Sequence, residues 1–339
     1  MNPELHCFSF HSVKGGVGKS TLSTLLAHVL AARRPDTPVF LIDMDLTGTS
    51  LSDVLPLEAP RWPSGRVEPL TPPTDFWSRE STLKRIDDRK GGPRSADELL
   101  IPYLNDYLLW ADPDWSTDRD VLPSALAWRM VGAPDNLRVI PSSALPGDLQ
   151  RIMPVIFDEE HAAFLEARIE ALLDSLIAAF TRCIVVFDTP PTIPGLSHSI
   201  LSLAFRLGGP TKLSLAEDGY MPGHLDNAAV RWKVALVLST DRQDLRAAQR
   251  WMMLVDDQQQ TQVRLVVNRV HESHRANVEV RLFGGDLGPE GHVDPDYPTL
   301  ANFSDIRIVP DDARMRLFGH DDIDPGTLVG LLDPADWLP

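Results

Sequence analysis

Cysteine, long apolar stretches and basic charge are all scarce in this sequence. Only Cys7 and Cys183 occur among the 339 residues, and both lie in apolar, strand-like segments far apart in the chain. We therefore expect buried, reduced thiols rather than a disulfide or a metal site. No apolar run approaches the roughly twenty residues of a transmembrane helix, and the N-terminus lacks the basic and then apolar pattern of a signal peptide. These absences predict a cytoplasmic protein without a membrane anchor.

Basic residues are outnumbered by acidic ones, 32 to 48, which gives a net charge of −16. A negative field of this kind opposes non-specific binding to nucleic acid. Hydrophobic residues make up 43% and charged residues 24% of the chain, as in an ordinary globular protein. The length suffices for one large α/β domain or two ordinary domains.

The chain is organised around residues 14–21, KGGVGKST. This segment fits the phosphate-loop pattern, except that Ser12 or Val13 stands near the position of the usual first glycine. Glycines let backbone N–H groups turn inward around phosphate oxygens. In this pattern Lys19 reaches the β- and γ-phosphates and the Ser20 hydroxyl binds Mg²⁺.

The segments on either side of the loop support this interpretation. Residues 5–10 form an apolar, strand-like run, and apolar residues recur at helical spacing from Leu22 to Leu30 before Pro35 ends the pattern. The loop then opens a helix whose N-terminus faces the phosphates. A chance glycine-rich turn is the alternative, and the flanking strand and helix disfavour it.

Two further apolar segments end in carboxylates. Residues 38–46 (PVFLIDMDL) carry Asp43 and Asp45, and residues 183–188 (CIVVFD) end at Asp188. Buried parallel strands would deliver these acids to the edge of the sheet where ligands bind. Asp188 would hold Mg²⁺ through water. A carboxylate that only caps its strand is the alternative, which the phosphate loop disfavours.

These motifs resemble those of the ParA/MinD family of dimerising ATPases. KGGVGKST resembles the family's deviant Walker A motif, in which the additional early lysine is Lys14. Asp43 and Asp45 resemble its switch I, and the Asp-Thr-Pro-Pro segment that begins at Asp188 resembles its Walker B and switch II. Residues 266–269 (VVNR) and the Pro310-Asp311 pair resemble the segments that contact adenine.

The resemblance implies a role for each matching residue. Lys14 would cross to the nucleotide of a partner subunit, Lys19 would bind phosphate, and Asp45 would orient the attacking water. Mg²⁺ would be held by Ser20 and Asp188 with support from Asp43. The nucleotide would contact Gly15, Gly16, Val17, Gly18, Lys19, Ser20, Thr21, Asn268, Pro310 and Asp311. For Asn268, a residue that merely ends its strand in a turn is the alternative.

The resemblance also implies the fold: one α/β domain over residues 1–339, built on a mostly parallel, doubly wound P-loop NTPase sheet with helices on both faces. We expect insertions at about 56–135 and 206–230 and an acidic C-terminal tail at 321–339. The first insertion holds five tryptophans, which we expect to form local cores rather than a ligand cage. A protein partner would contact the insertions.

The function that follows is an ATP-binding and ATP-hydrolysing dimerisation switch, which positions or regulates a protein partner or cargo. It needs ATP and Mg²⁺, forms a nucleotide-dependent homodimer, and turns over slowly with stimulation by the partner. One alternative is a nucleotide-stabilised regulatory or structural subunit with little turnover. Another is an Mrp-type iron–sulfur carrier, although the closely spaced cysteine pair that a cluster needs is missing.

Three other functions are less favoured. A tyrosine kinase of the related bacterial type is disfavoured because the chain has only four tyrosines. DNA binding stays open because of the arginines at 242–281, but their acidic neighbours favour a solvated mixed face. Membrane binding is not expected, because the acidic tail is no basic amphipathic helix.

Overall fold

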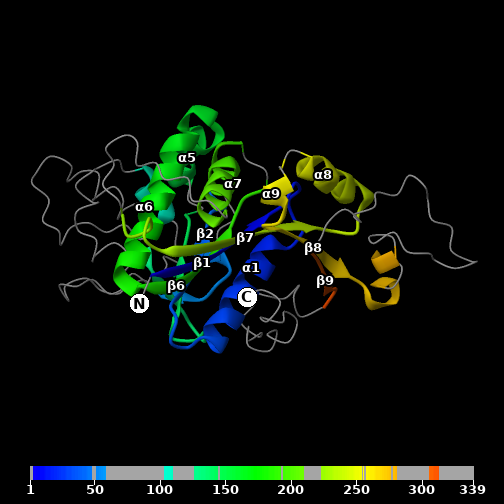
Figure 1. The fold of residues 1–339 in the computed structure, drawn as a ribbon, viewed down its shortest axis with the longest axis horizontal. Helices are drawn as coiled ribbons and strands as arrows, with labels where there is room; N and C mark the ends of the chain where they lie inside the picture. The colour runs from blue at the N-terminus through cyan, green and yellow to red at the C-terminus, as the bar shows by residue number, and fades with distance from the viewer. Residues whose placement is uncertain are drawn as a thin grey trace, which may run out of the picture.

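The computed structural model describes residues 3–47, 51–58, 103–109, 126–143, 146–191, 194–209, 223–253, 255, 257–275, 278–280 and 305–312. Within these residues one sheet has the strand order β3-β4-β5-β2-β6-β1-β7-β8-β9 (Figure 1). Its strands are β1 (Glu4–His11), β2 (Val39–Asp43), β3 (Leu57–Glu58), β4 (Trp128–Met130), β5 (Leu137–Ile140), β6 (Arg182–Asp188), β7 (Ala229–Leu238), β8 (Val263–Val270) and β9 (Ile306–Pro310).

Neighbouring strands from β5 to β9 pair in parallel, whereas β4 runs antiparallel to both β3 and β5. In register, Asp188 at the end of β6 lies opposite Asp43 of β2 and Phe10 of β1. The carboxyl ends of three adjacent strands therefore meet at one edge of the sheet. The predicted fold class, a mostly parallel α/β sheet, is confirmed.

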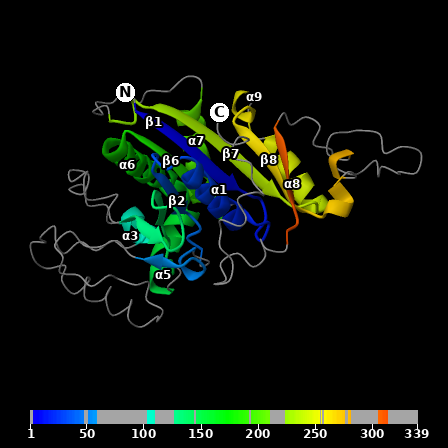
Figure 2. The ribbon, with the colours of Figure 1, turned by 90° about the horizontal axis from the view of Figure 1, so that it is seen from below.

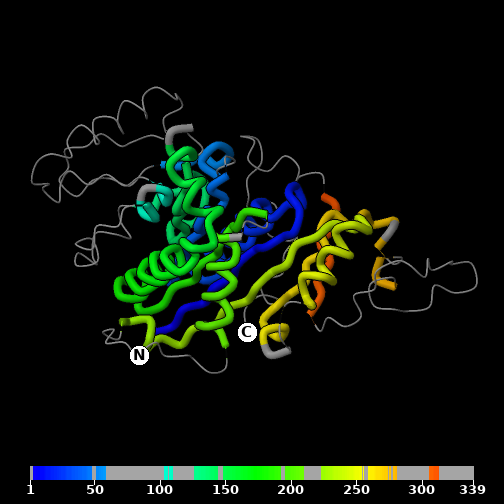
Figure 3. Tube along the Cα trace, turned by 90° about the horizontal axis from the view of Figure 1, so that it is seen from above, coloured from blue at the N-terminus to red at the C-terminus, as the bar shows by residue number. Residues whose placement is uncertain are grey.

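Helices cover both faces of this sheet. They are α1 (Lys19–Arg33), α3 (Leu104–Leu109), α5 (Pro146–Phe157), α6 (Ala162–Phe180), α7 (Pro194–Gly208), α8 (Arg242–Met252) and α9 (Asp257–Gln260), with the short 3₁₀ helices η1 (Leu51–Asp53), η4 (Glu159–His161) and η6 (Glu272–His274). Seen from below, α1 lies in front of the strands (Figure 2). Seen from above, α6, α7 and α8 lie in front of them (Figure 3).

Alternation along β1 shows how the sequence produces two cores. Leu5 and Cys7 point into the cluster beneath α5, α6 and α7, whereas Phe8 and Phe10 point into the cluster beneath α1. Side chains alternate between the faces of a strand, so an uninterrupted apolar run buries both faces at once. The expected buried central strands are present.

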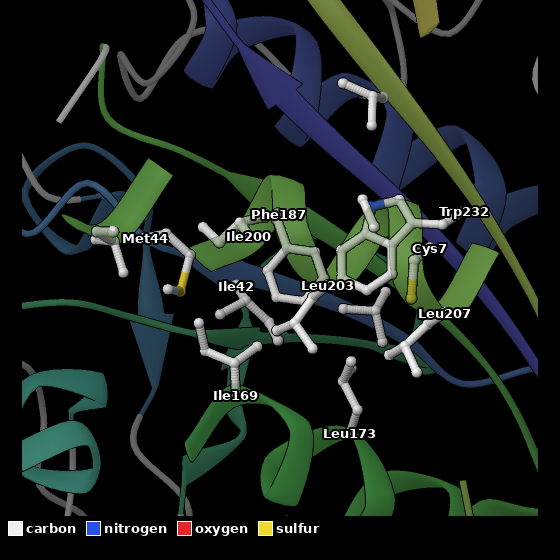
Figure 4. Packing of buried hydrophobic residues seen from close by; sticks show 14 of the residues in the cluster. Cys7, Ile42, Met44, Ile169, Leu173, Phe187, Ile200, Leu203, Leu207 and Trp232 are labelled. Carbon is white, nitrogen blue, oxygen red and sulfur yellow. The ribbon is translucent and has the colours of Figure 1, made fainter. Parts of the chain in front are cut away.

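The cluster beneath α6 and α7 is built around two aromatic rings. Phe187 of β6 and Trp232 of β7 stack with centroids 5.2 Å apart and planes 2° apart (Figure 4). Such a pair adds about 0.5–1.5 kcal/mol beyond its buried area. The Trp232 indole N–H donates to the Ser9 hydroxyl at 3.0 Å, so the buried ring leaves no unpaired donor.

The helix predicted after the phosphate loop is present, and the sequence also explains how two other helices begin. The helix after the phosphate loop is α1, which ends at Arg33 before Pro35. α8 begins after the carboxyl end of β7, and Asp241 caps it by accepting the Gln243 N–H at 3.0 Å. Residues 159–180 form the short η4 followed directly by the long helix α6.

Parts of the first predicted insertion extend the core. β3, α3 and β4 all lie between residues 56 and 135. Trp128 is fully buried and its ring lies 5.2 Å from that of Tyr103, so this tryptophan does belong to a core. The other tryptophans of the insertion, much of both predicted insertions and the acidic tail lie outside the described residues.

Candidate nucleotide-binding site

The predicted phosphate loop joins the end of β1 to the start of α1. Gly16 and Gly18 adopt left-handed backbone conformations, with φ of 77° and 92°. Gly18 caps α1 and has no side chain to occupy the first N–H groups of the helix. Those groups have no partner within a helix and carry its positive dipole. The loop therefore presents donors of the kind that bind phosphate oxygens.

Lys19 is buried at the base of this loop. Only 6% of the Lys19 surface is exposed to solvent. Burial lowers the pKa of its ammonium group, while the nearby carboxylates of Asp188 and Asp45 raise it. The predicted phosphate lysine and two predicted carboxylates thus lie within electrostatic reach of one another.

Asp188 is the most unusual group at this edge of the sheet. It is 1% exposed, and neither carboxylate oxygen has a hydrogen-bond partner among the described residues. Burial and then the neighbouring Asp43 raise its pKa to about 7, although the nearby Ser20 hydroxyl and Lys19 lower it. A buried carboxylate without donors is costly unless a cation approaches it.

Asp43 differs from Asp188 because its oxygens are already used by the chain. Oδ1 accepts the Asp45 N–H at 3.2 Å. Oδ2 accepts the Leu51 N–H at 2.8 Å and the Ser142 hydroxyl at 2.7 Å. Asp43 therefore ties together the turn that follows β2 and the loop that follows β5.

Asp45 lies in that turn and is partly exposed. Its Oδ1 accepts the Thr47 N–H at 3.3 Å and also the Thr47 hydroxyl. The turn is thereby closed on itself directly beside the predicted phosphate site. A carboxylate held in this way can accept a proton or orient a water molecule.

Asn268 links the end of β8 to the phosphate loop. Its Nδ2 donates to the Val17 carbonyl at 2.8 Å, while its Oδ1 is buried and has no partner among the described residues. Asn268, Arg269, Pro310 and Asp311 line an open pocket together with Gly18, Thr21 and Asp312. The structure therefore brings the predicted base-contact residues next to the predicted phosphate loop.

Lys14 points away from the loop interior. Its side chain is 54% exposed, and its ammonium group lies 3.5 Å from a carboxylate oxygen of each of Asp241 and Asp244. Both partners belong to the first turn and cap of α8 in the same chain. The Asp241 side chain is 48% exposed, so water screens its ion pair with Lys14, whereas the Asp244 side chain is only 5% exposed.

Sequence reasoning did not single out His11, which lies between the loop and the Walker B segment. It is buried, and its Nδ1 lies 3.4 Å from the Thr189 hydroxyl. Burial and then Lys19 lower its pKa to about 3. The imidazole is therefore neutral and adds no positive charge beside Lys19. A lone histidine at a strand end carries no sequence signal that would reveal this contact.

The two cysteines lie inside the sheet. Cys7 and Cys183 are free thiols, each at most 1% exposed, on the adjacent strands β1 and β6. Burial raises the pKa of both, that of Cys183 to about 12.

In the part of the chain that the structure describes, no group of three or more His, Cys, Asp or Glu side chains is arranged to hold a metal ion. No helix there is long and apolar enough to cross a bilayer.

Residues 5–78 match the family model described as ParA, NUBPL iron-transfer P-loop NTPase. The predicted resemblance to the ParA/MinD family is confirmed. The match covers the first strand, the phosphate loop and the turn with Asp43 and Asp45. The residues after position 78 lie beyond this match, so their site roles depend on the geometry above.

Solved structures agree on the fold. A ParA family ATPase from Chlorobium tepidum is 15% identical, with a TM-score of 0.51 over 98% of this chain and 97% of that one. Apo McdA from Cyanothece is 13% identical, with a TM-score of 0.50 over 96% and 93%. MinD from Pyrococcus horikoshii, complexed with Mg-ADP, matches at 14% identity and a TM-score of 0.45 over 98% and 92%. At such identities the first two comparisons establish a shared fold.

Proposed function

We propose that this protein is an ATP-binding and ATP-hydrolysing dimerisation switch that positions or regulates a protein partner or cargo in the cytoplasm. The observation that carries the proposal is the buried carboxylate of Asp188, which has no hydrogen-bond donor and lies beside Lys19 and Ser20. A group in this state is suited to a cation that arrives with a ligand. The match of residues 5–78 to a P-loop NTPase family model supports the nucleotide-binding part of this proposal.

Mg²⁺ fits the residues that are present. Its preferred ligands are oxygens, and it usually keeps part of its water shell. The two orphaned oxygens of Asp188 and the adjacent Ser20 hydroxyl provide suitable oxygens. When bound, the ion neutralises charge that develops on the phosphates. Asp43 would act from behind by fixing the turn that carries Asp45, because its own oxygens accept donors from the chain.

The chain's own groups supply the remaining stabilisation. The N–H groups of the loop and of the first turn of α1 would bind the phosphate oxygens, and Lys19 would balance the negative charge as the γ-phosphate leaves. Asp45 would orient the attacking water from the turn beyond β2. None of these groups has to move far, because burial and hydrogen bonds already hold them at one edge of the sheet.

The base would lie in the pocket beside Asn268. The amide Nδ2 is already bonded to Val17, which leaves the buried Oδ1 as an acceptor. Adenine offers an exocyclic amino donor to such an acceptor, whereas guanine presents a carbonyl oxygen at that position. Asn268 would therefore favour ATP over GTP, with Pro310 and Asp311 beside the base.

Dimerisation would use Lys14. In the single chain its ammonium group is held by Asp241 and Asp244. The exposed ammonium group of Lys14 would exchange these two carboxylates for the phosphates of a partner's nucleotide, which carry more charge. ATP would then favour the dimer, because the γ-phosphate makes contacts there that the monomer lacks.

The test is molar mass by light scattering with ADP and with ATP, on an Asp45→Ala variant that should retain ATP. A monomer with ADP that becomes a dimer with ATP is the expected result. Adding Lys14→Ala should preserve ATP binding and abolish the dimer. Lys233→Ala, which removes an ordinary surface lysine bonded to the Thr261 carbonyl, is the matched control and should dimerise normally. A molar mass that is the same with ADP and with ATP would refute the proposed dimerisation switch.

The contacts of Lys14 also favour a second candidate. If Lys14 kept Asp241 and Asp244 as partners with ATP bound, the protein would be a nucleotide-stabilised regulatory or structural subunit with little turnover. ATP turnover that stays at background while ATP still raises the melting temperature would support this candidate. Iron transfer, named in the description of the matching family model, is opposed by the burial of both cysteines.

A further inference from the structure

The loop that follows β5 holds the predicted switch I turn from three sides. The Ser142 hydroxyl donates to Asp43 Oδ2 at 2.7 Å and lies 3.3 Å from the Asp45 carbonyl oxygen. The Ser142 carbonyl accepts the Ser52 hydroxyl at 3.2 Å. Ser142 is fully buried, and its hydrogen bond with Asp43 is shielded from water, whereas its contacts with Ser52 and Asp45 are partly buried. The position of the Asp45 turn therefore depends on where this loop lies.

The loop is in turn held by Asn105 of α3. Its Oδ1 accepts the Ser143 N–H at 2.7 Å, and its Nδ2 donates to the Ser143 carbonyl at 3.2 Å. One side-chain amide thus satisfies both backbone groups of Ser143. Asn105 is fully buried, and an unpaired backbone group at such a place would be costly.

α3 is itself held by the loop after β5 and by α6. The Leu104 N–H donates to the Pro141 carbonyl at 2.8 Å. Within the helix, the Tyr107 hydroxyl donates to the Arg168 carbonyl of α6 at 3.0 Å, and the Arg168 guanidinium lies 4.4 Å from the centre of the Tyr107 ring. α3 packs against α5 and α6, and Figure 2 shows it close to α5. Hydrogen bonds and packing on two sides therefore define the position of α3.

We propose that Asn105 is a positioning residue for ATP hydrolysis, which acts through Ser143 and Ser142 on Asp43 and the Asp45 turn. This inference rests on the proposed function and extends it to α3, a helix within the predicted insertion. Asn105 touches neither the phosphate loop nor the pocket beside Asn268. Its loss should therefore disturb the placement of Asp45 and leave the groups that bind ATP in place.

The expected result is a separation of turnover from affinity. Asn105→Ala should lower kcat about tenfold, since a displacement well under 1 Å at a reacting group suffices for this, while the Kd for ATP changes less than about twofold. Asn136→Ala is the matched control. Its Nδ2 also donates to backbone carbonyls, those of Ala31, Arg34 and Thr37, but at the opposite end of β5. It should lose stability and keep kcat.

A second measurement keeps the inference testable without catalysis. Hydrogen exchange of the peptide that spans residues 43–52 reports the Asp45 and Leu51 N–H groups, which donate to Asp43. Asn105→Ala should raise exchange there, and Asn136→Ala should not. Ser142→Ala, which leaves α3 intact, should reproduce both the kcat loss and the faster exchange, so a failure of Asn105→Ala to fold does not end the test.

The outcomes separate this inference from the proposed function. If the wild-type protein binds ATP without hydrolysing it, the proposed hydrolysis fails, and faster exchange in Asn105→Ala would still establish the link from α3 to switch I. If the wild type hydrolyses ATP while both Asn105→Ala and Ser142→Ala keep its kcat and its exchange pattern, the positioning role is wrong and the proposed function stands.

Discussion

Replacing Gly18 by alanine tests whether the phosphate loop and β8 are joined as the structure shows. Gly18 has a φ of 92°, a conformation that side chains disfavour. A Cβ there would collide with Nδ2 of Asn268, the atom that donates to the Val17 carbonyl. Gly16 is the matched control, because it has a φ of 77° but open space around its Cβ position.

The two substitutions should differ by the cost of this collision. Both place alanine in a left-handed conformation, at about 1–2 kcal/mol, and both regain about 0.4–1 kcal/mol from a less flexible unfolded chain. Gly18→Ala must also displace Asn268. This loses a hydrogen bond worth about 0.5–1.5 kcal/mol and leaves the buried Val17 carbonyl unpaired, at about 1–3 kcal/mol in total.

Urea unfolding of the ligand-free variants measures the difference. We expect Gly16→Ala to lose about 1 kcal/mol and Gly18→Ala about 2–4 kcal/mol of unfolding free energy. Combining Gly18→Ala with Asn268→Ala should cost less than the sum of the two single substitutions, since the small side chain relieves the collision. Equal losses for Gly16→Ala and Gly18→Ala, or strict additivity in the double variant, would refute the contact between Asn268 and the loop.

Two other predictions concern groups inside the sheet. The folded pKa of Asp188 is raised to about 7 from 3.8, so the folded state binds this proton more tightly, and the contribution of Asp188 to stability falls as the pH rises from about 4 to about 7. Asp188→Asn should therefore raise the unfolding free energy of the ligand-free protein, by at most about 4 kcal/mol at pH 8 and by much less at pH 5. Urea unfolding at the two pH values measures this difference, and equal effects at both would contradict the prediction. Cys7 and Cys183 should resist a thiol reagent until the protein unfolds, because both are buried with raised pKa values. Protein purified anaerobically should also show no iron–sulfide absorbance. Rapid labelling of the native protein, or bound iron in it, would instead support the iron–sulfur carrier hypothesis.

The central sheet could be predicted because its signals are local. The apolar runs that end at Asp43 and Asp188 are long enough to indicate buried strands. Their order along the chain after the phosphate loop resembles the order of motifs in the ParA/MinD family. The short antiparallel strands β3 and β4 gave no such signal. β4 has three residues and pairs with its neighbours over only two positions on each side, so its place depends on tertiary contacts rather than on its own pattern.

The candidate site was predictable only in part, for the same reason. Gly18, Lys19 and Ser20 belong to one continuous motif, whereas the support of the site comes from residues far apart in the chain. Asn105 is 38 residues from Ser143, and Ser142 is 99 residues from Asp43. A buried asparagine on a six-residue helix resembles any other asparagine until its partners are known. Lys14 is a similar case, because its contact with α8 joins segments more than 200 residues apart.

Asp43 and Asp188 have similar sequence surroundings, but the structure gives their carboxylates different hydrogen-bond partners. Both follow apolar strands, and the two lie opposite each other in register. Asp43 accepts hydrogen bonds from Asp45, Leu51 and Ser142, whereas Asp188 accepts none from the described residues. Two buried carboxylates at this spacing repel each other, and each raises the cost of ionising its neighbour. Donors from the chain offset this cost at Asp43. At Asp188 only the nearby Ser20 hydroxyl and Lys19 favour the ionised form, and the pKa of Asp188 stays raised, so a bound cation would add stabilisation that the chain supplies only in part. We therefore infer that a divalent cation bound with the nucleotide makes its contact at Asp188, and that Asp43 serves the site by holding the turn around Asp45.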